Sequence, residues 1–239
     1  MNNTGFYSMM RKILKSIRVA IFLLLAGCGA SQELSGPQRI VFFGDSITQL
    51  GERPGGYVAL VRDSLLRGTW LEGSVVINAG ISGHKVTDLQ KRLSRDVLEK
   101  NPTVVVIYIG INDVWHSALP NHRGTPKDTF GIVLKEIIQL IRATKARVML
   151  CTPTVIGEKK NGENPQDAML DEYAEVSRTV AKELGIPLCD LRALFTATEK
   201  NLNADNSEKG VLTADRVHLN ATGNKLVANE IVRMLQLLR

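Results

Sequence analysis

Residues 39–46 read Arg-Ile-Val-Phe-Phe-Gly-Asp-Ser, a short apolar run that ends in a glycine and two polar residues. A run without alternating polar positions is typical of a strand buried on both faces of a parallel sheet. Similar runs rich in Val and Ile predict the strands Arg39–Phe43, Val75–Asn78, Val104–Ile109, Arg147–Cys151 and Pro187–Cys189. The first four are almost continuously apolar, so we expect them to be buried on both faces.

Between these strands lie longer stretches with apolar residues at helical spacing. They predict helices at Tyr57–Leu66, Val86–Leu98, Thr129–Ala143, Met169–Leu184 and about Ala221–Leu238. Alternation of strands and helices favours a parallel sheet with right-handed crossovers and helices on both faces. The prediction is therefore an α/β domain, a three-layer α/β/α sandwich with a five-stranded parallel sheet. Such sheets bind ligands beyond the carboxyl ends of their strands.

The composition suits one globular domain, with 239 residues of which 44% are hydrophobic and 23% charged. The net charge of +6 comes mostly from the first 27 residues, which contain no Asp or Glu and hold four of the 30 basic residues: Arg11, Lys12, Lys15 and Arg18. The remainder has 26 basic (30 − 4) against 24 acidic residues. It has no dense basic block with interleaved aromatics, so we expect no nucleic-acid partner.

Residues 1–27 are predicted to be a signal peptide, with a basic start and the apolar run Val19 to Ala26. That run is too short for a bilayer core, which needs about 20 residues. The segment Leu25-Ala26-Gly27-Cys28 resembles the bacterial lipobox, which implies lipidation of Cys28 and an exported protein anchored in the cell envelope. Gly29 favours the outer membrane or its periplasmic face. The alternative is a cleavable signal peptide that happens to contain a cysteine.

On this interpretation residues 28–37 form a tether and residues 38–239 form the folded domain. The two cysteines of the domain, Cys151 and Cys189, lie in strand-like runs. Buried free thiols are favoured over a disulfide, although an oxidising compartment would permit one.

Polar residues follow the predicted strands in three blocks, and a fourth block precedes the last helix. The blocks are Gly44-Asp45-Ser46, Asn78-Ala79-Gly80-Ile81-Ser82-Gly83, Gly110-Ile111-Asn112-Asp113 and Asp215-Arg216-Val217-His218. Together, from about Ile40 to Leu226, they resemble the SGNH (GDSL-type) hydrolase family, in which Ser, Gly, Asn and His lie in four separated blocks. The resemblance implies a flavodoxin-like fold and a serine esterase that works through an acyl-serine intermediate.

The residue types fit that chemistry. Ser46 is the predicted nucleophile, and a serine hydroxyl needs a base that removes its proton during attack. His218 is the predicted base, and Asp215, three residues earlier, is predicted to orient its imidazole. By the resemblance, the oxyanion hole would consist of the main-chain N–H groups of Ser46 and Gly80 and the side-chain amide of Asn112. Read singly, these blocks are also compatible with turn residues and helix caps.

Other residues near the blocks are candidates for substrate contacts. We assign substrate binding to Asp45, Trp115 and His116, although Trp115 is equally compatible with a packing anchor. Asp45 and Asp113 are expected to brace their loops. His84, His116 and His122 are interpreted as surface or pocket-wall residues, because no pair of them has metal-ligand spacing with a carboxylate. We therefore expect neither a metal nor another cofactor.

The predicted reaction is hydrolysis of carboxylic esters. Short connections between the blocks leave little chain for a lid. The predicted export would place the protein in the periplasm or at the exterior of the cell envelope. Both features favour small acyl groups, such as acetyl on carbohydrates, as the substrate. The partners expected are a small-molecule or glycan ester and, through the lipid anchor only, a membrane. The alternatives are lysophospholipid or thioester hydrolysis, a non-catalytic glycan-binding lipoprotein, and a metal-dependent hydrolase that uses Asp215 and His218 as ligands. The sequence does not indicate an oligomeric state.

Overall fold

A computed structural model of the chain describes residues 34, 36–67 and 72–238. The predicted signal peptide, Cys28 and the tether as far as residue 33 lie outside the described residues. Leu34 is buried, and its N–H donates to the main-chain oxygen of Leu238 at 3.0 Å. Leu34, inside the predicted tether, is thus bonded to the C-terminal end of the described chain.

The described residues form a five-stranded sheet with the order β2-β1-β3-β4-β5. Every neighbouring pair is parallel, as predicted. The strands are β1 (Arg39–Gly44), β2 (Val75–Gly80), β3 (Val104–Tyr108), β4 (Arg147–Cys151) and β5 (Leu188–Cys189). The prediction that the first four strands are buried on both faces is wrong for β2, which is partly exposed along its length because it lies at the edge of the sheet.

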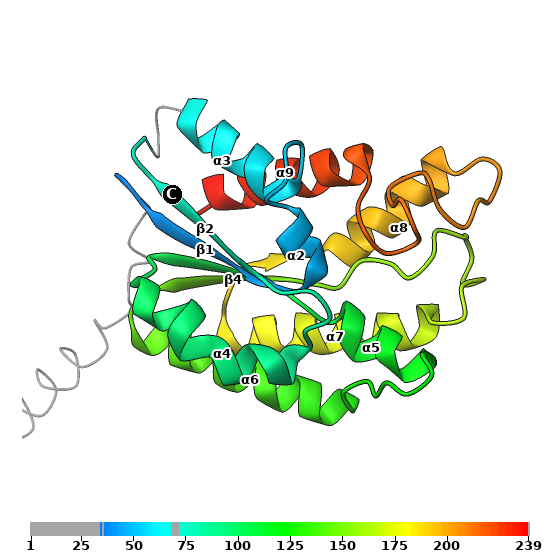
Figure 1. Cartoon of the computed structure of the whole chain (residues 1–239), viewed down its shortest axis with the longest axis horizontal. Helices are drawn as coiled ribbons and strands as arrows, with labels where there is room; N and C mark the ends of the chain where they lie inside the picture. The colour runs from blue at the N-terminus through cyan, green and yellow to red at the C-terminus, as the bar shows by residue number, and fades with distance from the viewer. Residues whose placement is uncertain (1–33, 35, 68–71, 239) are drawn as a thin grey trace, which may run out of the picture. The chain divides into compact units, whose positions relative to one another are not determined.

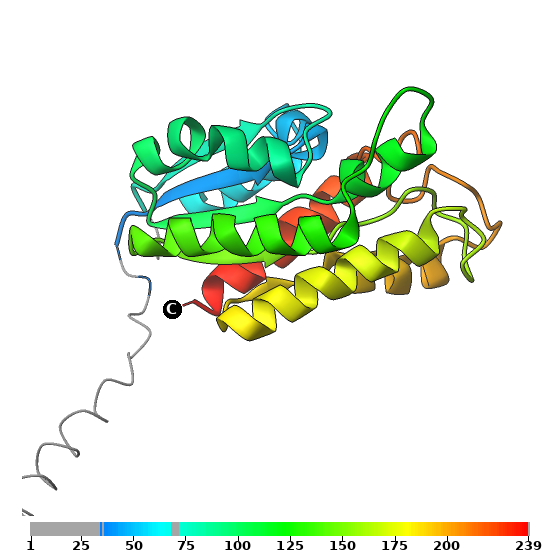
Figure 2. The same cartoon turned by 90° about the horizontal axis from the view of Figure 1, so that it is seen from below.

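Helices cover both faces of this sheet, which confirms the three layers (Figure 1). One face carries α3 (Tyr57–Arg67), α8 (Leu191–Leu202) and α9 (Ala221–Gln236), and the other carries α4 (Val86–Asp96), α6 (Lys127–Ala143) and α7 (Asp167–Leu184). Figure 2 shows the second layer from below, with α4, α6 and α7 running alongside one another. None of the helices in the described part of the chain is long and apolar enough to span a membrane.

The predicted helices are present with small shifts at their ends. The third and fourth begin at Lys127 and Asp167, two residues earlier than predicted, and α4 ends at Asp96, before a short 3-10 turn, η1 (Leu98–Lys100). Helix α8 was not predicted. Its N-cap is Asp190, whose side chain accepts a hydrogen bond from Ala193 N–H, so a capping signal was present in the sequence.

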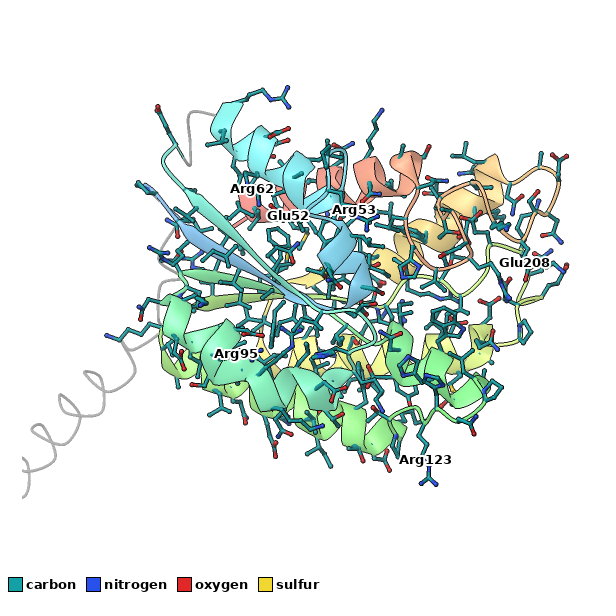
Figure 3. All side chains as sticks on the ribbon, in the orientation of Figure 1. Glu52, Arg53, Arg62, Arg95, Arg123 and Glu208 are labelled. Carbon is teal, nitrogen blue, oxygen red and sulfur yellow. The ribbon has the colours of Figure 1, made fainter. Side chains whose placement is uncertain are left out.

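The core lies between the sheet and the helices, where side chains fill the space between the ribbons (Figure 3). All of β3 is buried. On the α3 face, the ring of Tyr57 packs edge-to-face on Phe42 at 5.7 Å and on Tyr108 at 6.1 Å between ring centres. Cys151 and Cys189 are register partners on β4 and β5, and both are buried free thiols, as predicted.

Two short helices start directly from the carboxyl ends of adjacent strands. They are α2 (Ser46–Leu50), after β1, and α5 (Ile111–Trp115), after β3. Because parallel strands all end at the same edge, this topology brings the polar blocks of the sequence to one side of the sheet.

Candidate active site

Ser46 is the first residue of α2, and Asp45 is the N-cap of that helix. The Asp45 carboxylate accepts a hydrogen bond from Ile47 N–H at 2.9 Å, which fixes the turn that presents the serine. The Ser46 residue is 7% exposed. Within the described part of the chain its main-chain N–H is paired with no acceptor, so this donor remains available.

His218 lies 172 residues further along the chain, yet its Nε2 atom is 2.9 Å from the Ser46 hydroxyl oxygen. Its Nδ1 atom is 2.7 Å from Oδ2 of Asp215. Because a carboxylate can only accept, Nδ1 carries the proton and Nε2 is the acceptor for the serine O–H. The structure therefore joins the three predicted residues in one hydrogen-bonded chain.

The turn from Asp215 to His218 holds its own carboxylate in place. Oδ1 of Asp215 accepts from Val217 N–H at 3.1 Å and from His218 N–H at 2.8 Å, which leaves Oδ2 for the imidazole. Partial burial works to raise the pKa of Asp215, but these hydrogen bonds outweigh it and lower the pKa. The carboxyl is thus kept ionised beside His218. Arg216, inside the turn, has a φ of 91°, a strained conformation for a residue with a side chain.

A buried carboxylate anchors the segment that leads into this turn. Glu158, in the loop after β4, is 0% exposed. It accepts from Val211 N–H and Leu212 N–H at 2.7 Å each, and from Thr213 N–H. The same loop is tied to the turn by Gly157 N–H, which donates to the Arg216 oxygen at 2.8 Å. Glu158 belongs to none of the four sequence blocks, and it was not identified as a functional residue from the sequence.

The third block places Asn112 in α5 after a tight turn at Gly110, whose φ of 125° disfavours any residue with a side chain. Asn112 is 3% exposed, and its Nδ2 donates to the His84 main-chain oxygen at 3.0 Å. Asp113 accepts from Val86 N–H at 3.1 and 3.3 Å, so it braces its loop as predicted. Burial raises the pKa of Asp113 to about 6.

The structure does not leave Gly80 N–H free to serve as an oxyanion donor, because it donates to the Asn78 side-chain oxygen at 2.8 Å. A glycine is required there for packing, since a Cβ would lie 2.2 Å from the main-chain nitrogen of Gln49. The other amides of the loop also have partners: Ile81 pairs with Gly44, Ser82 with Gln49 and His84 with Ile81.

Gly83 is different, because its N–H is paired with no acceptor in the described part of the chain. It directly precedes His84, whose oxygen holds Asn112. Both glycines were visible in the sequence block, but which N–H is free depends on Asn78, whose amide is oriented by donation from Nδ2 to the Thr48 oxygen of α2 at 2.6 Å.

The three predicted substrate-binding residues differ in accessibility. Asp45 is 2% exposed and its side chain caps α2, in agreement with the expectation that it braces its loop, while its assignment to substrate binding stays a prediction. Burial raises its pKa to about 7. Trp115 is half-buried against the core, and His116 is half-buried with its ring 5.1 Å from that of His122. Among the described residues, neither side chain forms a hydrogen bond or a ring contact with Ser46 or His218.

In the described part of the chain no group of three or more His, Cys, Asp or Glu side chains is arranged to hold a metal ion. Asp215 and His218 point their polar atoms at each other and at Ser46.

Comparison with known proteins identifies the family of the chain. Residues 42–226 match the model of the GDSL-like Lipase/Acylhydrolase family. The acetylxylan esterase of Geobacillus stearothermophilus is 32% identical over 211 residues, which cover 82% of this chain and 93% of that protein. The crystal structure of the acetyl xylan esterase AlAXEase superposes with a TM-score of 0.78 at 42% identity, covering 81% of this chain and 97% of that one. An uncharacterized lipoprotein of Bacillus subtilis, YqeF, is 25% identical over 87% of this chain and 93% of its own length.

The family model spans most of the folded domain, the acetylxylan esterase relative matches over nearly its full length, and the solved esterase structure shares the α/β fold. The chain therefore belongs to the GDSL-like lipase/acylhydrolase family and is a carboxylic ester hydrolase.

Proposed function

We propose that this esterase removes short acyl groups, above all acetyl, from carbohydrate esters, with Ser46 as nucleophile and His218 and Asp215 as its base and orienting carboxylate. The observation that carries the proposal is the continuous chain of hydrogen bonds from Asp215 Oδ2 to His218 Nδ1 at 2.7 Å and from His218 Nε2 to Ser46 Oγ at 2.9 Å. This arrangement matches what acyl transfer through a serine requires.

In the first step Ser46 Oγ attacks the ester carbonyl while its proton passes to His218 Nε2. The resulting imidazolium is stabilised by Asp215 across its Nδ1–H bond. Collapse of the tetrahedral intermediate breaks the bond to the alcohol oxygen, which takes the proton from His218, and leaves the acyl-serine. Water then attacks the acyl-serine while His218 accepts its proton. Collapse of the second tetrahedral intermediate breaks the bond to Ser46 Oγ, which takes that proton back from His218, and releases the carboxylic acid.

The negative charge of the tetrahedral oxygen needs preorganised donors. We propose the N–H of Ser46, the N–H of Gly83 and the Nδ2 amide of Asn112. Gly83 replaces Gly80 because the Gly80 N–H is occupied by Asn78, whereas that of Gly83 has no partner in the described part of the chain. One hydrogen of the Asn112 amide holds His84, so the second is available for the oxyanion.

Preference for a small acyl group is supported by the loops at this edge of the sheet. The long segments that follow β4 and α8 are tied together: Asn203 donates to the Glu158 main-chain oxygen at 2.7 Å, and Lys160 N–H donates to the Asn206 side chain at 2.7 Å. Two loops that are hydrogen-bonded to each other in this way hold each other in place beside the proposed site. They do not resemble a lid that opens over a long acyl chain. The names of the acetylxylan esterase relatives point to the same substrate class.

We further propose that the protein is exported and anchored through lipid on Cys28, which gives it access to polysaccharide outside the cell. The proposal rests on the lipobox-like segment that ends at Cys28. It is also supported by the similarity to YqeF, which is named a lipoprotein.

The test is hydrolysis by purified residues 29–239 of acetylated xylooligosaccharides, p-nitrophenyl esters of increasing chain length, lysophospholipid and a thioester. We expect the acetyl substrates to be hydrolysed fastest, and covalent labelling by a fluorophosphonate that is lost in Ser46→Ala. Faster turnover of lysophospholipid or thioester would replace the proposed substrate. A folded protein that is neither labelled nor active would favour a glycan-binding module. Loss of activity with EDTA and recovery with zinc would favour a metal-dependent hydrolase.

A further inference from the structure

Arg92, on α4, is buried in a position where an arginine needs several partners. Its side chain is 5% exposed. The guanidinium donates from Nη2 to the Gly44 oxygen at 2.7 Å, and from Nη1 to the Ala79 oxygen at 2.8 Å and to Asp96 at 2.9 Å. Its Nε donates to His84 Nδ1 at 3.0 Å. The guanidinium carbon also lies 4.6 Å from the centre of the Phe43 ring.

Apart from Asp96 on the same helix, the acceptors of Arg92 lie in or next to segments that carry the proposed catalytic groups. Gly44 ends β1 two residues before Ser46, and Ala79 lies near the end of β2. His84 directly follows Gly83, and its main-chain oxygen holds the Asn112 amide. A single side chain therefore connects the nucleophile turn to the loop that contains Gly83, and through His84 to Asn112.

The bond to His84 also fixes the state of that imidazole. Arg92 Nε–H can only donate, so His84 Nδ1 must be unprotonated and the ring proton lies on Nε2. Burial and the nearby charge of Arg92 lower the pKa of His84, which keeps the ring neutral. A protonated His84 would lose this bond and repel the guanidinium, so the hydrogen bond between Arg92 and His84 requires the neutral ring.

We propose that Arg92 is a positioning residue for the esterase reaction, which holds the Ser46 turn and the Gly83–His84 loop at the spacing that the oxyanion hole needs. The inference rests on the proposed function. The planar fork of arginine reaches two main-chain oxygens and a ring nitrogen at once, whereas a lysine ammonium on a flexible stem does not reproduce these directions. Loss of the fork should therefore weaken stabilisation of the transition state more than substrate binding.

Helix α4 offers a matched control in Arg95, which Figure 3 labels. Arg95 pairs with the same Asp96, at 2.6 Å from Nε, but its side chain is 68% exposed and it has no contact with the site in the described part of the chain. Substitutions at residues 92 and 95 therefore share the helix, the residue type and the acidic partner. They differ in contact with the strand ends.

The experiment compares Arg92→Lys and Arg92→Ala with Arg95→Lys and Arg95→Ala, by steady-state hydrolysis of p-nitrophenyl acetate and by the rate of fluorophosphonate labelling. We expect Arg92→Lys to lower kcat by about 10-fold to 100-fold with KM changed less than about 3-fold, in the range of a misplaced catalytic group. Labelling should slow in parallel. Millimolar methylguanidinium should restore part of the kcat of Arg92→Ala, which a merely structural role would not predict.

A folded Arg92→Lys variant with kcat and labelling within about 2-fold of the unsubstituted enzyme would overturn the proposal. If both Arg92 variants fail to fold, His84→Ala decides, because it removes the imidazole and keeps the bonds to Gly44 and Ala79. An unchanged kcat in His84→Ala would then refute the proposal that Arg92 positions the Gly83–His84 loop, and a parallel fall in kcat and labelling would support it. Inactive unsubstituted and Arg95 proteins would instead count against the proposed function itself.

Discussion

Glu158→Gln tests whether one buried carboxylate holds the Asp215–His218 turn in place. The substitution keeps the shape of the side chain but replaces one oxygen with an NH₂ group. If the remaining oxygen keeps Leu212 and Thr213 as its donors, the NH₂ faces Val211 N–H, which is also a donor. The variant therefore contains two opposed donors where the structure has a hydrogen bond.

The expected cost follows from those contacts. An unpaired donor costs about 1–3 kcal/mol, and each of the two bonds that lose a charged acceptor weakens by roughly 1 kcal/mol. A total of about 3–5 kcal/mol should lower Tm by roughly 6–20 °C for a chain of this size. Because the affected residues lie just before Asp215, we also expect kcat to fall by about 10-fold or more with a smaller change in KM.

The assay is thermal unfolding followed by circular dichroism, together with p-nitrophenyl acetate kinetics below the transition. Glu163→Gln is the control, because it makes the same substitution in the same loop at an exposed residue that accepts one bond from Asn206 at 2.8 Å. A Tm and a kcat for Glu158→Gln that match those of the control would refute the anchoring role.

Three further outcomes are expected. Asn112→Ala should lower kcat by around 10²-fold in ester hydrolysis, since one oxyanion donor contributes roughly 2.7–4 kcal/mol, and unchanged turnover would remove Asn112 from the oxyanion hole. Burial raises the pKa of Asp45 from 3.8 to about 7, so its stabilising contribution is present at low pH and is lost as pH rises through about 7. Asp45→Asn should thus gain roughly 3 kcal/mol relative to the unsubstituted protein between pH 5 and pH 8, measured by urea unfolding; a difference independent of pH would contradict the raised pKa. Cys28→Ser should release the full-length protein from the membrane fraction, and its retention there would argue against the lipid anchor.

Periodicity in the sequence was sufficient for the architecture of the domain. Apolar runs and amphipathic stretches predicted all five strands and the helices α3, α4, α6, α7 and α9, because a parallel sheet covered on both faces imposes a distinctive pattern on the chain. The errors have local causes. Strand β2 looks like a buried strand in the sequence, and only its place at the edge of the sheet makes it partly exposed. Helix α8 was passed over although its Asp190 cap was visible.

The predicted triad residues were also readable from the sequence, since Ser46, Asp215 and His218 lie in blocks whose residue types suit acyl transfer. The sequence did not show which N–H groups and side chains are already hydrogen-bonded in the fold, so it could not assign the roles that depend on this. Gly80 and Gly83 share one block, yet Asn78 occupies the N–H of the first and leaves that of the second free. Asp45 stands beside the nucleophile in sequence, but the fold buries it as a helix cap.

The amino-acid sequence by itself determined the fold class, the family and the three residues predicted to carry the reaction. Only the tertiary structure decided which N–H groups are available and which distant side chains hold the site, as Arg92 holds Gly44 and Glu158 holds Leu212. The physical reason is that a strand or a helix follows from the pattern of neighbours along the chain. The bonds from Arg92 to Gly44 and from Glu158 to Leu212 join groups that are dozens of residues apart and meet only when the chain has folded. The Asn78 amide that occupies Gly80 N–H is likewise oriented by a bond to the Thr48 oxygen, 30 residues away.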